Sequence, residues 1–534
     1  MTADNAPTLP AAPETGQARR ALVTGATGYI GSQVTTELLE RGWTVRTLSR
    51  SRDKALTMPW AGRVVPEGQA AGSGEVEVHV GDADSGEDLA AALTGIDVAW
   101  YLVHSMGTGK GFAEHEREMA RAFARAAEQQ RVGRIVYLGG LHPEGEELSE
   151  HLASRVTVGD VLLDSAVPTA ALQAGVVLGA GSASFQMLRH LSERLPGAVA
   201  PQWVDNRITP ISVRDAVHYL VGAADLPAEV DRSFDIGGPD TLSYAEMMQR
   251  YAAAVDLPKR RVLTAPVTTP SLASQWIGLV TPVNAGLAEP LIGSLLNDTV
   301  LEERDLEDLV GRPPGGNQTF EEAVRTAVAD GEHGEGLDTR RWRRVLLSSA
   351  AAVGACAAVG TILTDPSNRW YRSLRKPAWQ PPAAAFPIVR TLLYADLAVI
   401  SALVTADDLE AGNRKAVRNS AIALGTNLVL NAGWTGLFFR GKKPVLSTIE
   451  AAALALSSAD LVRRAARSAP QRGVVLAPYA AWTGLAVALS AIDRPPQSRP
   501  LSRPPCSLPV PHVCGPLSWG ESLPGPSTGI GSRP

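Results

Sequence analysis

Three glycines, Gly25, Gly28 and Gly31, follow a short apolar segment at residues 21–24. A helical pattern at residues 30–41 comes next, so strand, glycine-rich turn and helix stand in the order that a dinucleotide site needs. Gly25 permits a tight turn, Gly28 lets the backbone approach a pyrophosphate, and Gly31 lets helix and strand pack closely. The N–H groups at the helix start favour the same anion. We predict nucleotide binding; the alternative is a glycine-rich turn of another α/β fold.

The end of the second predicted strand, residues 43–48, decides which nucleotide is expected. An NAD site would place Asp or Glu there for the ribose 2′-OH, but this chain has Arg50 and Arg52. Guanidinium groups suit a 2′-phosphate, at roughly 1.5–3 kcal/mol per charged hydrogen bond. We therefore predict NADP(H) rather than NAD(H), the alternative being two solvated arginines. Asp82, after the third strand, either meets the adenine edge or caps the loop at Asp84.

A second set of residues with chemical potential lies in the last third of the chain. Trp379, Trp434 and Trp482 each offer a broad face and one N–H, which suits a flat amphipathic ligand. Asn431 stands within an apolar run and needs a partner from a neighbouring helix or from the ligand. The alternative for the tryptophans is an interfacial belt, which suits Trp379 better than mid-helix Trp434.

The elements that position the first set alternate along the chain. Further apolar strands are expected at residues 76–80, 98–103, 134–138 and 169–178, with helical patterns between them, such as residues 114–130. This alternation predicts a Rossmann-like, doubly wound parallel sheet with helices on both faces.

Residues 18–330 resemble the atypical short-chain dehydrogenase/reductase superfamily, on its NmrA-like, NAD(P)H-binding side. The resemblance adds Thr27, Tyr29 and Ile30 to the expected cofactor-binding residues, and it implies a small lobe over the nicotinamide end. The matching stretches are Thr24–Gly31, Gly81-Asp82, Tyr101–Gly107, Tyr137–Gly140, Gly181–Phe185 and Ile236–Pro239.

The chain departs from that superfamily at its catalytic pair. Reductases of the superfamily use Tyr-x-x-x-Lys, in which Lys lowers the pKa of the Tyr, but none of the nine Tyr here has a Lys four residues later. Gly139-Gly140 replaces the usual Ser after the fifth strand. His104 and Ser105, at the mouth of the fourth strand, are the substitutes expected from position; the alternative for His104 is a structural role. Whether the chain is an NADP-dependent oxidoreductase stays open.

Five apolar segments in succession predict an all-α transmembrane bundle. Residues 345–363 carry no charge over a length that spans a bilayer core of about 30 Å. The other segments are residues 385–405, 416–439, 445–461 and 474–492, and several are rich in Ala, which suits close helix contact in lipid. A soluble helical bundle is the alternative.

This part resembles the TspO/MBR family, the tryptophan-rich sensory or translocator proteins. The resemblance implies a five-helix bundle whose pocket takes a porphyrin, a sterol-like lipid or an isoprenoid, closed by the loop after the first helix. It adds Pro382, Tyr394 and Tyr479 to the expected ligand-binding residues. The matching stretches are Trp370–Pro382, Phe386-Pro387, Leu393-Tyr394, Asn427–Phe439 and Ala477–Trp482. Arg390 stands where the family usually has Trp, and Ser490 replaces a usual Asn.

Charge and composition favour a bacterial-type plasma membrane with the N-terminal domain in the cytoplasm. The first twenty residues hold no apolar core and hence no signal peptide. Four arginines just before the first span favour a cytoplasmic start. The net charge of −5 argues against nucleic acid, and the three Cys form neither a metal site nor a disulfide framework. Partners are expected to be the apolar ligand and membrane lipid, and a homodimer stays open.

The predicted organisation has five parts: a disordered N-terminus (1–17), an NAD(P)-binding domain (18–330), a linker (331–344), the TspO/MBR-like domain (345–493) and a disordered Pro-rich tail (494–534). The first function hypothesis is a redox-linked sensor or carrier of tetrapyrroles or isoprenoids. The alternatives are an NADPH-dependent reductase whose lipophilic substrate the bundle delivers, and a scaffold with a structural nucleotide.

Overall fold

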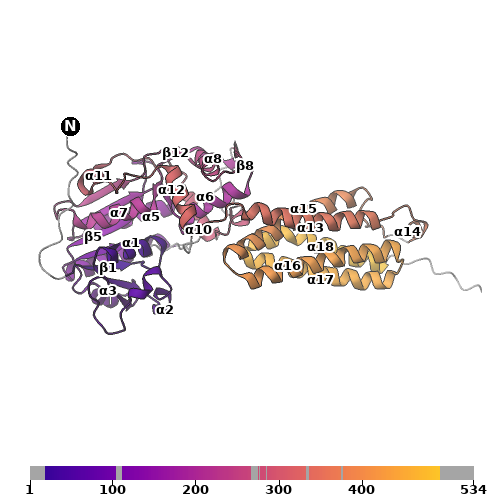
Figure 1. Cartoon of the computed structure of the whole chain (residues 1–534), viewed down its shortest axis with the longest axis horizontal. Helices are drawn as coiled ribbons and strands as arrows, with labels where there is room; N and C mark the ends of the chain where they lie inside the picture. Colours follow the sequence, from indigo (N-terminus) through magenta and orange to yellow (C-terminus); the bar gives the residue numbers. More distant parts are fainter. Residues whose placement is uncertain are drawn as a thin grey trace, which may run out of the picture.

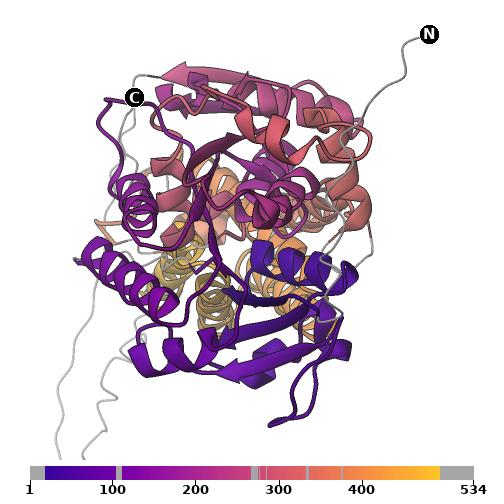
Figure 2. The same cartoon turned by 90° about the vertical axis from the view of Figure 1, so that its left-hand side faces the viewer.

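The computed structural model describes residues 18–103, 111–265, 275, 277–283, 285–331, 336–374 and 377–492. An N-terminal α/β part and a C-terminal helical bundle are joined end to end (Figure 1). Seen along the long axis from the α/β side, the bundle lies behind the α/β part (Figure 2).

Seven parallel strands form the central sheet in the order β11-β6-β5-β4-β1-β2-β3. The order reverses between β1 and β4, so the sheet is doubly wound, as predicted, and the switch point lies beside the glycine turn. The bounds are β1 Arg20–Thr24, β2 Thr44–Ser49, β3 Val76–Val80, β4 Val98–Tyr101, β5 Arg134–Gly140, β6 Thr169–Ala174 and β11 Arg232–Ile236.

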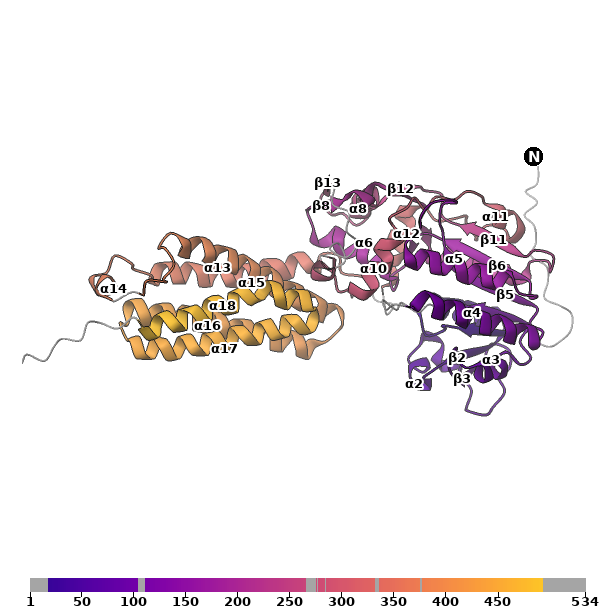
Figure 3. The ribbon, with the colours of Figure 1, turned by 180° about the vertical axis from the view of Figure 1, so that it is seen from behind.

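Both faces of the sheet are buried, because successive side chains of a strand point to opposite sides. Ala21 and Val23 pack into one apolar cluster, and Leu22 packs into another. The first cluster is closed by α1 Tyr29–Glu40, α7 Val213–Gly222 and α11 Asp305–Val310, and the second by α3 Gly86–Leu93, α4 Phe112–Gln129 and α5 Glu150–Leu163. In Figure 3, α4 and α5 lie in front of the sheet.

A small lobe with its own apolar core follows β6. Its strands are β7 Val177–Leu178, β8 Gly197–Pro201, β9 Arg207–Ile208, β10 Ile211–Ser212, β12 Leu242–Ser243 and β13 Arg261–Ala265. Its helices are α6 Ala183–Arg194, α8 Tyr244–Ala254, α10 Ala285–Gly293 and α12 Phe320–Asp330. The short elements of the α/β part are α2 Arg52–Ala55, η1 Pro59–Arg63, η2 Gln202–Asp205 and η3 Ala223–Asp225.

Five helices of the bundle are long and apolar enough to cross a membrane. They are α13 Arg341–Leu363, α15 Ala385–Glu410, α16 Arg414–Thr435 with its π-helical end η4 Gly436–Arg440, α17 Pro444–Ser468 and α18 Pro470–Ile492. Short α14 Arg369–Ser373 lies at the end of the bundle far from the α/β part (Figure 1). Large apolar side chains face outward, with Leu392, Val429 and Leu456 between 66% and 75% exposed. Such an outer surface is suited to lipid.

Two expectations about element bounds were wrong. The single strand expected at residues 169–178 is interrupted at Gly175, where an added Cβ would lie 3.0 Å from the carbonyl oxygen of Thr209. β7 therefore leaves the main sheet and pairs with β10. The helices α13 and α15 also extend beyond the apolar segments, to Arg341 and Glu410, because these charged ends pair with each other at 3.7 Å and Glu410 also pairs with Arg189 of the α/β part.

Candidate functional site

Close backbone contacts build the glycine turn between β1 and α1. Gly25 has a φ of 71°, and a Cβ there would lie 2.5 Å from the carbonyl oxygen of Leu102. A Cβ at Gly31 would lie 2.3 Å from the carbonyl oxygen of Gly25. Real Cβ atoms do not approach so closely, so both glycines are required by the fold of the turn itself.

Gly28 has a different role, because its backbone is extended (φ −87°, ψ 171°). The nearest atom to an added Cβ is the carbonyl oxygen of Gly25, at 3.2 Å, which is a tight contact but not the direct clash found at Gly25 and Gly31. Gly28 is the N-cap of α1, and no side chain caps that helix start. An uncapped helix start with an exposed glycine fits a pyrophosphate, whose oxygens would accept hydrogen bonds from the N–H groups of the first turn.

Tyr29 connects this turn to the loop before α6. A Cβ on Gly179 would lie 2.2 Å from the Tyr29 hydroxyl, and a Cβ on Gly181 would lie 2.5 Å from the Tyr29 ring. Both glycines therefore make room for the tyrosine. Of the other predicted residues, Thr27 is partly exposed in the turn, and Ile30 packs against the core.

The two predicted arginines point to different places, and Asp82 forms a hydrogen bond within its own loop. Arg50 is exposed just past the end of β2. Arg52 points to another loop, where its guanidinium donates to the carbonyl oxygen of Val65 at 3.0 Å. Asp82 accepts from the backbone N–H of Asp84 at 3.2 Å, which is the loop-capping alternative. Arg50 is thus the better placed of the two for a 2′-phosphate.

Polar side chains around the expected catalytic position are engaged in structural contacts. The Tyr137 hydroxyl donates to the carbonyl oxygen of Arg155 at 3.0 Å, and burial raises the pKa of Tyr137 to about 12. Ser154 donates to Glu116 at 2.6 Å, and Arg155 donates to the carbonyl oxygen of Gly139 at 2.9 Å. His104 and Ser105 lie outside the described residues.

A polar cavity of about 350 Å³ lies between α5 and the strands β5, β6 and β11. Charged side chains line it, among them Arg155, Asp160, Arg232, Asp235 and Glu303. This lining suits an ionic molecule. The apolar ligand expected from the sequence was placed in the bundle, not in this cavity.

In the bundle, three of the predicted ligand residues form one row of hydrogen bonds across α15, α16 and α18. The Tyr394 hydroxyl donates to Asn431 Oδ1 at 2.7 Å, and Asn431 Nδ2 donates to the Tyr479 hydroxyl at 3.3 Å. Tyr479 donates to Asn427 Oδ1 at 2.6 Å, and Asn427 donates to Ser458 at 3.0 Å. Neighbouring helices therefore satisfy Asn431, as a membrane helix requires.

The predicted aromatic residues lie nearer the end of the bundle that carries α14. Trp434 stacks on Phe438 with ring centroids 5.6 Å apart, and its indole N–H donates to Ser490 at 3.1 Å. Trp482 meets the ring of Phe386 at 5.5 Å. Trp379 and Pro382, in the loop before α15, are both exposed, Trp379 at 51%. Ser490, which replaces the usual Asn of the family, accepts the hydrogen bond of Trp434.

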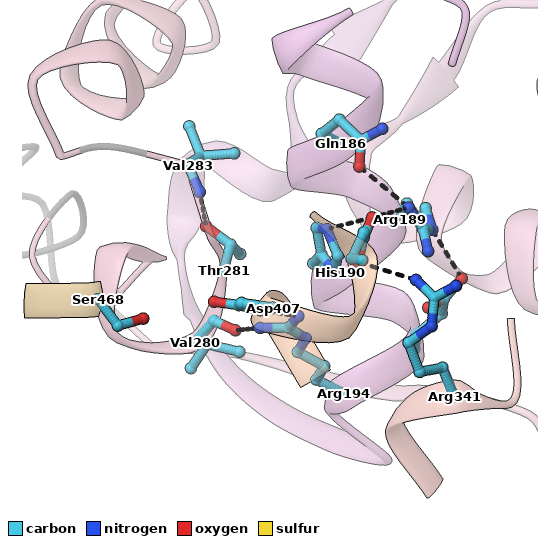
Figure 4. Close-up of polar contacts among 12 residues, drawn as sticks. Gln186, Arg189, His190, Arg194, Val280, Thr281, Val283, Arg341, Asp407 and Ser468 are labelled. Atoms are coloured by element: carbon cyan, nitrogen blue, oxygen red, sulfur yellow. Dashed lines mark hydrogen bonds and ion pairs between the residues drawn. The ribbon is translucent and has the colours of Figure 1, made fainter. Parts of the chain in front are cut away.

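Sequence reasoning missed the ionic joint between the two parts of the molecule, centred on α6. Every residue of α6 from Phe185 to Arg194 is buried, including four charged or titratable side chains. Asp407 near the end of α15 accepts from Arg194 of α6, and the two residues lie side by side in Figure 4. Asp407 also accepts from Arg472 of α18, at 2.6 Å. Glu410 pairs with Arg189 of α6 and, at 3.7 Å, with Arg341 of α13.

Further hydrogen bonds complete this joint. Arg194 donates to the carbonyl oxygen of Val280 at 2.6 Å, and Arg472 donates to that of Leu279 at 2.9 Å. The lobe contributes Glu193, which accepts from Arg189 at 3.1 Å and from Tyr251 at 2.7 Å. The buried charges are therefore paired, as burial in a low-dielectric region requires.

His190 lies inside the joint with 1% of its surface exposed. Burial, and then the positive charges of Arg194 and Arg189, hold the pKa of His190 well below its usual value. The imidazole is therefore neutral, and it fills space between arginines without adding to their repulsion.

One sequence signal could have revealed the joint. Carboxylates at 407, 408 and 410 end an otherwise apolar span, and α6 carries cations at 189 and 194. Both patterns are also typical of ordinary solvated helix ends, so the sequence did not single them out.

Comparison with known proteins matches both parts. Residues 348–492 match the TspO/MBR family, and residues 25–174 match a family described as NAD(P)H-binding. The tryptophan-rich protein TspO of Chlorobaculum tepidum is 30% identical over 146 residues, which are 26% of this chain and 90% of that protein. The N-terminal part is accordingly an NAD(P)H-binding domain, and a nicotinamide nucleotide is the class of cofactor that its glycine turn fits.

Two further similarities concern the N-terminal part. A ceramide reductase of Caulobacter vibrioides is 28% identical over 279 residues, covering 50% of this chain and 81% of that protein. Among solved structures, a Citrobacter sp. triphenylmethane reductase complexed with NADP(H) has a TM-score of 0.43 at 18% identity, covering 57% of this chain and 99% of that one.

Proposed function

Because this chain belongs to the TspO/MBR family through residues 348–492, we propose that it senses or carries an apolar ligand in the membrane under the control of a bound nicotinamide nucleotide. The chain is an integral membrane protein with five candidate spans. Porphyrins, sterol-like lipids and isoprenoids are the ligand classes considered.

The observation that carries the proposal is that α6 connects the glycine turn to the bundle. The loop before α6 packs on Tyr29 at the glycine turn. Farther along, Arg189 and Arg194 of α6 bind the carboxylates of α15. A change in the cofactor turn can therefore displace the same helix that the bundle holds.

Two helices continue the connection into the membrane. α15 carries Tyr394 as well as Asp407, 13 residues apart, or about 20 Å at about 1.5 Å per residue. α18 carries Arg472 and Tyr479, seven residues apart, or about 10 Å. The ionic joint and the Asn431 row thus share two helices, α15 and α18.

The test is reciprocal binding. The affinity for NADPH is measured with and without protoporphyrin IX, and the affinity for protoporphyrin IX with and without NADPH, in the full-length protein in detergent. Coupling predicts the same factor in both directions, roughly 5-fold or more. If protoporphyrin IX binds and neither affinity depends on the other molecule, the proposal of redox-linked control fails.

We expect Arg50→Ala to narrow the preference for NADPH over NADH. The exposed Arg50 guanidinium would lose its contact to the 2′-phosphate, costing about tenfold in NADPH affinity and little in NADH affinity. Isothermal titration with both nucleotides measures this. Arg52→Ala is the matched control, since Arg52 donates to Val65 instead. Equal affinities for the two nucleotides in the parent protein would contradict the NADP(H) preference.

The N-terminal domain is proposed to face the cytoplasm of a cell with a bacterial-type plasma membrane. With five spans, a reporter fused after Ile492 should be exposed on the opposite side from a reporter fused before Arg341. Cysteine accessibility to an impermeant reagent measures this. Both reporters on one side would require an even number of spans.

The similarity to a ceramide reductase favours a second candidate, reduction of a lipophilic substrate by NADPH. Two observations weigh against it: Ser154 and Arg155 are held in structural contacts, and the Asn431 row lies about 20 Å of helix from the joint. Ligand-dependent oxidation of NADPH by the purified protein distinguishes the candidates, since a sensor binds both molecules without consuming the nucleotide.

A further inference from the structure

Arg390 of α15 is a cation inside the bundle whose charge no side chain balances in the described part of the chain. Its guanidinium lies over the ring of Tyr394, 5.0 Å from the centroid. The terminal nitrogen Nη2 is buried and has no hydrogen-bond partner among the described residues. A guanidinium remains charged in proteins. The free-energy penalty of a buried charged donor without a hydrogen bond exceeds the stabilisation that a cation–π contact provides.

The surroundings show that this nitrogen points into the bundle. A Cβ on Gly360 of α13 would lie 1.9 Å from Nη2, so the guanidinium packs directly against the backbone of α13 at this glycine. An arginine that reached for lipid headgroups would extend its terminal nitrogens outward to the interface. Here Arg390 is half-buried and Nη2 is turned against Gly360 of α13, so a partner inside the bundle is the one that its direction favours.

The neighbours of Arg390 on α15 indicate the shape of that partner. Phe386, Arg390 and Tyr394 are spaced four residues apart and so follow one side of the helix over about 12 Å. Phe386 contacts Trp482, and Tyr394 joins the Asn431 row. An aromatic pair, a cation and a hydroxyl thus follow one another along the same stripe.

We propose that Arg390 binds the carboxylate of a flat apolar ligand, so that the bundle selects amphipathic acids over neutral molecules of the same shape. The proposal rests on the proposed function, since it names the chemical class of the ligand for that site. The planar fork of a guanidinium matches a carboxylate in geometry and charge. Arg390 is a specificity-determining residue in this account, and the aromatic rings supply the apolar contact.

The experiment compares protoporphyrin IX, which carries two carboxylates, with its dimethyl ester, by tryptophan quenching of the full-length protein in nanodiscs of zwitterionic lipid. The parent protein should bind the acid about tenfold more tightly than the ester. Arg390→Gln should bring this ratio close to one, and Arg390→Lys should retain most of it. Arg440→Gln, at an exposed arginine that donates to the Ile362 carbonyl oxygen, is the matched control and should keep the parent ratio.

Each other outcome overturns the proposal. Equal binding of acid and ester by the parent excludes recognition of the carboxylate, whether or not Arg390→Gln can be purified. An equal loss of both ligands in Arg390→Gln identifies a purely structural role. If phosphatidylglycerol in the nanodiscs removes the preference for the acid, the anion at Arg390 is a lipid phosphate. Failure of both porphyrins to bind rejects the proposed apolar-ligand function as well, whereas binding without a preference for the acid rejects only the role of Arg390.

Discussion

Gly28→Val is expected to abolish nucleotide binding while the protein remains folded and inserted. The backbone at Gly28 is extended, and a Cβ there would lie 3.2 Å from the carbonyl oxygen of Gly25, a tight contact that a shift of a few tenths of an ångström relieves. The valine would instead project where the pyrophosphate has to approach the start of α1. We expect a loss of NADPH affinity of at least about 100-fold, because the phosphate contacts of the turn would be lost together. Fluorescence titration of bound NADPH measures this.

The matched control is Gly86→Val, at the first residue of α3, where an added Cβ meets nothing within 4 Å. It should bind NADPH as the parent does. Gly31→Val tests the other role, because its Cβ would clash with the carbonyl of Gly25 and the domain should lose stability. Unchanged NADPH affinity in a folded Gly28→Val protein would mean that the nucleotide binds elsewhere.

Asp407→Asn is expected to weaken the joint between the two parts of the molecule by about 3–5 kcal/mol. The aspartate accepts from Arg194 and Arg472, both buried, and its loss leaves two guanidinium groups without a counter-charge. Midpoints of thermal unfolding in detergent, with each part monitored separately, should fall and separate. Nucleotide and porphyrin should then bind independently of each other.

Asp408→Asn provides the control, because the neighbouring carboxylate pairs with no arginine in the described part of the chain. A double variant, Asp407→Asn with Arg194→Gln, should lose less stability than the sum of the single variants, since it removes one of the orphaned charges. Strict additivity would show that the ion pair does not hold the joint.

Local sequence patterns sufficed for much of this architecture. The strand β1 Arg20–Thr24, expected at residues 21–24, and the glycine turn were predictable because backbone conformation and the order of strand, turn and helix depend on adjacent residues. The five spans were predictable because a bilayer demands a long apolar run. The doubly wound sheet and the five-helix bundle are both confirmed.

Contacts between distant segments could not be predicted in this way. Arg189 and Arg194 look like the solvated side of an amphipathic helix until the end of α15, more than 200 residues later, covers them. Arg52 was grouped with Arg50 by spacing, but the loop at Val65 engages it. The seventh strand, β11, and the break at Gly175 likewise depend on partners far along the chain.

The position of α6 between the two parts has a consequence for how they would behave if the chain were divided. α6 binds α15 through the ion pairs of Arg189 and Arg194, and the same carboxylates of α15 also pair with Arg341 of α13 and Arg472 of α18. The peptide connection between α12 and α13 keeps the two parts close together and so raises their effective concentration, but the interface between them is complementary in charge without it. Two separately expressed polypeptides, divided between Asp330 and Arg341, would therefore reassociate through the joint.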